Sequence, residues 1–139
     1  MLSRRPPHPS EDEAGSVAHS ISFSRMIASP AYPFDETAQK SQIMAAIRRA
    51  YNPAGFGRQI AAIVAIGDLR SRLATITVPT LVVHGSDDLL VPMTSGEDIA
   101  ANIQNADLLI IEGMGQELPP ALYDTVVSAI IRNVHRASA

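Results

Sequence analysis

Two short apolar runs, "PTLVVHG" at residues 79–85 and "DLLIIE" at residues 107–112, constrain the fold of this chain most strongly. Each run is aliphatic and β-branched and ends at a glycine or a charged residue, which is typical of a parallel strand buried on both faces. A helix is predicted for "EDIAANIQ" at residues 97–104, and a second, long helix from Pro119 onward. The order of strand, helix, strand and helix predicts a βαβα unit with a right-handed crossover.

A sheet of two parallel strands is marginal in water, because parallel strands need helices on both faces and neighbours at both edges. Residues 77–139 are therefore interpreted as one end of a larger α/β sheet. Residues 14–76 show helical periodicity instead, broken by prolines, and we predict helical hairpins there, with Asp35 as one helix cap. Residues 1–13 combine three prolines with arginines and an acidic cluster, and we expect a flexible lead-in.

The composition excludes several classes of function. The chain has 139 residues, 46% of them hydrophobic, and a formal net charge of −3 without blocks of like charge, so we expect no nucleic-acid and no membrane partner. It has no cysteine, which rules out a disulfide or a thiolate metal site, and we expect neither metal nor cofactor. The first residues lack the apolar core of a secretory signal, so a cytoplasmic location is the expectation.

Polar side chains follow both predicted strands. Asp87 and Asp88 come after the first strand, and Gln116 and Glu117 come after the second, in the loop "GMGQELPP". In an open parallel sheet the functional residues sit on loops at the carboxyl ends of the strands. A carboxylate from the first loop and a polar tip from the second could therefore form a hydrogen bond.

The segments "VPTLVVHGSDDLLVP" and "NADLLIIEGMGQELPP" resemble the C-terminal part of the α/β-hydrolase fold, close to esterases of the aclacinomycin-methylesterase type. The resemblance implies that Asp88, the third residue after Gly85, holds the position of the triad acid. It also implies that Gln116 stands where the family carries its catalytic histidine. Residues 14–76 then correspond to the lid, and residues 77–139 to the last two strands and helices of the sheet.

The chain departs from that family in two ways. The family's nucleophile is a serine on a G-x-S-x-G turn, and no such motif occurs among the 139 residues; Ser86 is flanked by bulkier residues and belongs to the acid loop. A carboxamide at position 116 cannot accept and return a proton as an imidazole does. The expectation is a hydrolase-family chain that is inactive alone, or else a non-catalytic binding module or a truncated gene product.

Each candidate residue also has a plainer interpretation. Asp88 could cap an Asx-type turn, Gln116 could be a surface loop residue, and His84 is more typical of a structural histidine than of a substitute base. His19 lies on a lid-like helix, where a lone histidine is usually half-buried. For partners we expect self-association or a complementary hydrolase fragment, with a small apolar ester as ligand.

Overall fold

The computed structural model describes residues 7–137 of the chain, apart from the side chain of Pro53, so part of the predicted lead-in lies outside the described residues. The described chain divides into two compact units. The first runs from the described N-terminal residues to Met26 and includes Phe34–Val64; the second comprises Ile27–Pro33 and the chain from Ala65 onward. The short connection Ile27–Pro33 therefore belongs with the strands rather than with the helices that it joins.

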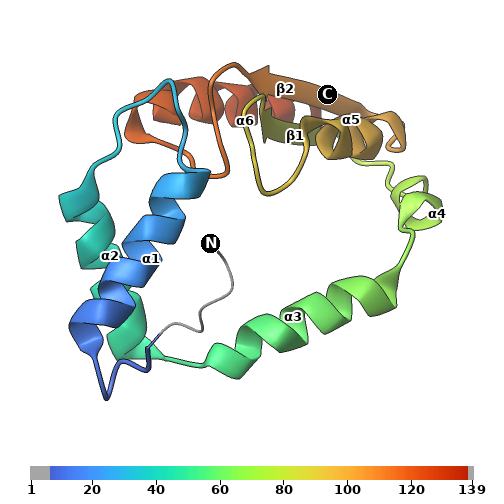
Figure 1. Cartoon of the computed structure of the whole chain (residues 1–139). Helices are drawn as coiled ribbons and strands as arrows, with labels where there is room; N and C mark the ends of the chain where they lie inside the picture. The colour runs from blue at the N-terminus through green and yellow to red at the C-terminus, as the bar shows by residue number, and fades with distance from the viewer. Residues whose placement is uncertain (1–6, 138–139) are drawn as a thin grey trace. The chain divides into compact units, whose positions relative to one another are not determined.

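The first unit is helical, as predicted. Figure 1 shows its helices, which are α1 (Glu13–Ile27), α2 (Glu36–Arg49) and α3 (Pro53–Ile66), with the ends of α1 and α3 continuing into the second unit. The predicted cap is confirmed, because the Asp35 carboxylate accepts a hydrogen bond of 2.9 Å from the backbone N–H of Ala38 at the start of α2. The side chain of Gln39 donates to Ser24, which ties α2 to α1.

The second unit contains the strands and helices expected for residues 77–139, together with α4 and the segment Ile27–Pro33. Its elements in chain order are α4 (Arg70–Leu73), β1 (Thr80–Gly85), α5 (Met93–Ala101), β2 (Ala106–Ile111), a 3-10 turn η1 (Pro120–Leu122) and α6 (Tyr123–Ala137). The two strands are parallel and the helices flank them, which confirms the predicted fold class.

The register of the strands decides where the loops begin. Thr80 pairs with Ala106, and Gly85 at the end of β1 pairs with Ile111 at the end of β2. Both strands therefore end side by side, and the loops that follow them leave the same edge of the sheet. The core of the unit is made of buried apolar side chains, one of them in the loop after β2: Ile111, Met114, Leu122 and Val126, with Tyr32, Val83 and Leu109 packed against them.

Three expectations were wrong in detail. The long helix predicted from Pro119 begins at Tyr123, after the 3-10 turn η1. The helix predicted for residues 97–104 begins earlier, at Met93, includes Gly96 and ends at Ala101. That glycine is required by packing, because a Cβ on it would lie 2.8 Å from the ring of His84. The strands are also less buried than expected, since Asp107 and Leu108 of β2 are exposed.

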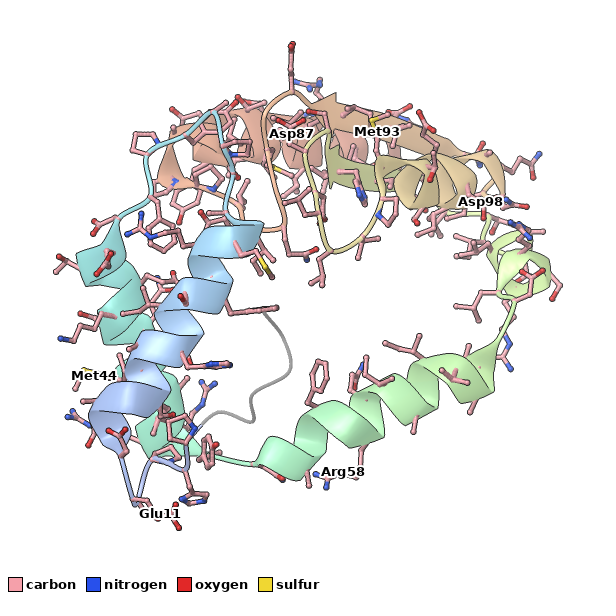
Figure 2. The ribbon with its side chains drawn as sticks, viewed as in Figure 1. Glu11, Met44, Arg58, Asp87, Met93 and Asp98 are labelled. Atoms are coloured by element: carbon pink, nitrogen blue, oxygen red, sulfur yellow. The ribbon has the colours of Figure 1, made fainter. Side chains whose placement is uncertain are left out.

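On α4, the Arg70 guanidinium pairs with Asp98 of α5, which is labelled in Figure 2. The hydrogen bond to Asp98, followed by its charge, raises the pKa of Arg70. No helix of the described residues is long and apolar enough to cross a membrane.

Candidate functional site

Asp88 lies in the loop after β1 with its carboxylate held by the backbone. Its Oδ1 accepts hydrogen bonds from the N–H groups of Leu90, at 2.8 Å, and Val91, at 2.9 Å. The Asp88 side chain is 6% exposed, so its carboxylate is largely shielded from water. The two backbone N–H groups replace the hydrogen bonds that water would otherwise donate. The two bonds form the Asx-type turn that was the plainer interpretation of Asp88, and they leave Oδ2 free to meet a second partner.

That second partner is Gln116, in the loop after β2. In the amide orientation that satisfies both groups, the Gln116 nitrogen donates to Asp88 at 2.7 Å from Oδ2 and 3.2 Å from Oδ1. The structure thus brings together the two residues that the sequence placed on neighbouring loops. A hydrogen bond to a carboxylate that backbone N–H groups already hold in place is charge-assisted and belongs to the stronger class.

The two loops are in contact because Gly85 leaves room for the second loop and Ser86 forms a hydrogen bond to it. A Cβ on Gly85 would lie 2.1 Å from the Met114 carbonyl oxygen, so only a glycine fits at the end of β1. Ser86 Oγ accepts a hydrogen bond of 2.8 Å from the N–H of Gly113, and Asp87, labelled in Figure 2, donates its N–H to the Met114 carbonyl at 3.0 Å. Ser86 therefore joins the two loops, a role that sequence reasoning did not assign to it.

Sequence reasoning also missed a third segment of the site, residues 27–33. The backbone N–H of Gln116 donates to the Ile27 carbonyl at 3.0 Å, and the Ser29 hydroxyl bonds to the backbone of both neighbours of Gln116. Tyr32 adds a longer bond of 3.4 Å to the Glu112 carbonyl. These contacts join residues 80 or more positions apart, and no local pattern in the sequence indicates them.

His84 lies close to Asp88, but its ring forms a hydrogen bond with a different group, the Val91 carbonyl. Its Nε2 lies 3.0 Å from the Val91 carbonyl oxygen and 3.9 Å from Asp88 Oδ2, beyond hydrogen-bond distance. The side chain is 12% exposed and packs against Gly96. This geometry suits a structural histidine that fixes the loop, rather than a base that faces a substrate.

The other histidines lie outside this site. His19 belongs to α1, and His8 packs edge-to-face on Tyr51 with its Nδ1 2.7 Å from the Ser10 hydroxyl. His135 is exposed near the end of α6. Within residues 7–137 no group of three or more acidic or histidine side chains is arranged to hold a metal ion.

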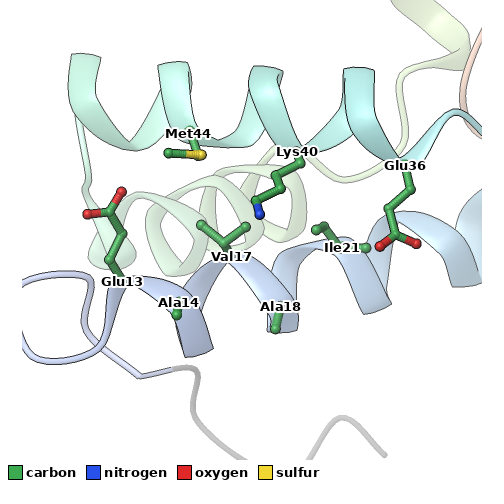
Figure 3. A pocket seen from close by; sticks show the side chains of 8 residues that line it. All are labelled: Glu13, Ala14, Val17, Ala18, Ile21, Glu36, Lys40 and Met44. Atoms are coloured by element: carbon green, nitrogen blue, oxygen red, sulfur yellow. The ribbon is translucent and has the colours of Figure 1, made fainter.

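A separate hollow lies in the first unit, between α1 and α2. Its volume is about 430 Å³, and its lining combines apolar side chains, including Val17, Ile21 and Met44, with the charged side chains of Glu13, Glu36 and Lys40. Figure 3 shows the Lys40 side chain extending from α2 into this hollow, with Glu13 at one end. Apolar walls with a few charged groups are typical of a small-molecule site.

The chemistry of the Asp88–Gln116 pair is limited by the carboxamide. A carboxylate opposite a histidine orients the ring and stabilises the imidazolium that forms in catalysis. A carboxamide in the same place donates the same hydrogen bond, but it has no basicity near neutral pH. The pair is therefore a carboxylate–carboxamide hydrogen bond that cannot transfer a proton near neutral pH.

Comparison with known proteins gives a likeness over part of the chain. The chain is 48% identical over 48 residues to a 2-hydroxy-6-oxononadienedioate/2-hydroxy-6-oxononatrienedioate hydrolase from Cupriavidus pinatubonensis. Over that stretch the chain is similar to a hydrolase. The match covers 34% of this chain and 17% of that relative, so it spans about one sixth of the relative's length. No family model matches the chain. The two parallel strands with their flanking helices are consistent with the C-terminal portion of an α/β-hydrolase.

Proposed function

We propose that this chain is a partial α/β-hydrolase of carboxylic-ester hydrolase ancestry, close to the aclacinomycin-methylesterase type. In this proposal Asp88 holds the position of the triad acid and Gln116 that of the histidine. The observation that carries it is the 2.7 Å hydrogen bond from the Gln116 carboxamide to an Asp88 carboxylate already fixed by two backbone N–H groups. In a catalytic triad the histidine N–H donates to the acid in the same way. The likeness to a hydrolase supports the ancestry.

We further propose that the chain is catalytically inactive by itself. Gln116 cannot serve as a base, and the sequence contains no G-x-S-x-G motif to supply a nucleophile. The nucleophile, the oxyanion hole and the remaining strands would then come from another stretch of polypeptide, with residues 14–76 acting as the lid. Exposed apolar side chains on α6, such as Val127 and Ile131, support such a complement, because they are half-exposed in this chain.

The test is complementation. The chain is co-expressed with a fragment that supplies the first six strands and the serine turn of such an esterase, and initial rates are measured for wild type, Gln116→His, Asp88→Asn and the double variant. Gln116→His should raise the rate by orders of magnitude, because it returns a base that Asp88 can orient. Adding Asp88→Asn should remove most of that gain, up to about 10⁴-fold.

Gln104→His is the matched control, since it places an imidazole on an exposed glutamine position away from the pair and should leave the rate unchanged. If the complex forms and binds ester, but Gln116→His changes nothing, the assignment of position 116 is wrong.

A binding module is the second candidate function, and the hollow between α1 and α2 favours it. A volume of about 430 Å³ falls within the range of small-molecule sites, and the apolar lining residues would accept the apolar part of a small ester. Saturation-transfer NMR with a short-chain alkyl ester tests this function. Ile21→Asp in the lining of the hollow should abolish the transfer while Ser41→Asp, on the exposed surface of α2, preserves it. Equal transfer in both variants would rule out the hollow as the site.

A further inference from the structure

The loop that carries Gln116 is held by a hydroxyl from the segment 27–33, which lies far from it in the sequence. Ser29 Oγ accepts a hydrogen bond of 2.9 Å from the N–H of Gly115 and donates one of 3.1 Å to the carbonyl of Glu117. These two residues flank Gln116. One side chain therefore fixes the backbone on both sides of the residue that faces Asp88.

The same segment leaves the loop little freedom to move. The N–H of Gln116 donates to the Ile27 carbonyl at 3.0 Å, so three successive residues, 115 to 117, are all bonded to residues 27–29. A Cβ on Gly115 would lie 2.7 Å from the carbonyl oxygens of Ile27 and Ala28, which shows how closely the two backbones approach. Ser29 itself is 2% exposed, so water cannot easily replace its hydroxyl.

Gln116 needs this support because its own side chain is exposed. An exposed glutamine loses considerable rotamer entropy when it is held in one conformation, and a single hydrogen bond to Asp88 offsets that loss only if the backbone already aims the side chain. Burial does not fix the direction of the Gln116 side chain. The hydrogen bonds between residues 27–29 and the loop fix the backbone from which that side chain extends.

We infer that Ser29 is a positioning residue for the Asp88–Gln116 pair, acting through the backbone of Gly115 and Glu117. The inference rests on the proposed function for the meaning of the pair, but the positioning itself concerns only contacts within this chain. In an assembled hydrolase the same hydroxyl would aim whatever side chain stands at position 116.

The readout is the side-chain amide of Gln116, observed by ¹⁵N–¹H NMR in the full chain. Asp88→Ala, which removes the acceptor, defines the change in chemical shift that corresponds to complete loss of the pair. Ser29→Ala should produce at least half of that change, because the loop is then free to turn Gln116 away. Ser20→Ala is the matched control: it removes a serine hydroxyl that donates to a carbonyl of its own helix, that of Ser16, and should leave the Gln116 signals unchanged.

If Ser29→Ala lowers stability but leaves the Gln116 amide at its wild-type shifts, Ser29 has a structural role only and the inference is overturned. Should Ser29→Ala fail to fold, Ser29→Cys decides, because a thiol of similar size packs in the same place but bonds weakly to Gly115. A folded Ser29→Cys chain with wild-type Gln116 signals would also overturn it. A failure of the complementation experiment alongside the expected shift changes would count against the proposed function and not against Ser29.

Discussion

Replacing Gly85 by alanine should separate the two loops of the site. The added Cβ would lie 2.1 Å from the Met114 oxygen and 2.7 Å from the Gly115 oxygen, and both are backbone atoms. The second loop must therefore retreat by about 1 Å, and overpacking of this kind costs about 1–3 kcal/mol. The retreat also strains the bond from Asp87 N–H to Met114 and the bond from Gly113 N–H to Ser86, each worth about 1 kcal/mol.

The total expected loss is about 3 kcal/mol in the free energy of unfolding of the second unit. With a urea m-value of about 2 kcal/mol/M, the midpoint should fall by about 1.5 M. The assay is urea unfolding followed by NMR signals of the strand amides, with the Gln116 side-chain amide as the local readout. Gly85 does not have a positive φ, so alanine tests space alone and not backbone conformation.

Gly57→Ala is the control, because nothing lies within 4 Å of the Cβ that it adds on α3. It should stabilise that helix by about 0.5–1 kcal/mol and leave the strands unaffected. A Gly85→Ala chain whose urea midpoint falls by less than about 0.3 M, with the Gln116 signals in place, would refute the claim that close approach of the two loops builds the site.

Three further predictions concern the chain as a whole. Purified alone, it should not hydrolyse an activated ester above background; turnover abolished by Asp88→Asn would contradict this. It should self-associate, since Val127 and Ile131 on α6 are about half-exposed. Light scattering should then report a mass that rises with concentration above 14.8 kDa, and Ile131→Lys should lower it; a constant monomer mass would refute the idea. Asp35→Ala should cost about 0.5–2 kcal/mol by removing the cap of α2, seen as reduced helicity by circular dichroism; unchanged helicity would show the cap to be dispensable.

The strands and the pairing of the site residues could be predicted because their signals are local. Two aliphatic runs ending at Gly85 and at Glu112 indicate strands, and parallel strands bring their following loops together. Asp88 and Gln116 therefore meet as the sequence predicts. The start of α5 was misplaced, because Thr94 and Gly96 are poor helix formers and only the ring of His84 explains the glycine.

The segment 27–33 could not be predicted, because its contacts with the loop of Gln116 depend on tertiary structure. Ser29 follows closely after α1, which itself contains several serines, and nothing in its neighbourhood indicates a buried hydroxyl. Its partners are backbone groups more than 80 residues away. Every residue has such groups, so the sequence does not indicate which of them a serine will bind. Sequence reasoning finds side chains that carry chemistry more readily than those that hold a loop in place.

The most direct test of the central claim is the pKa of an imidazole placed at position 116. In Gln116→His, titrated by NMR, a ring that donates to the Asp88 carboxylate should have a pKa at least about one unit above the usual value of about 6.5, because a nearby negative charge favours the protonated form. Adding Asp88→Asn should return the pKa to about 6.5, and Gln104→His should show that value throughout. The same pKa in Gln116→His with and without Asp88→Asn would contradict the claim that these two positions form an acid–histidine pair.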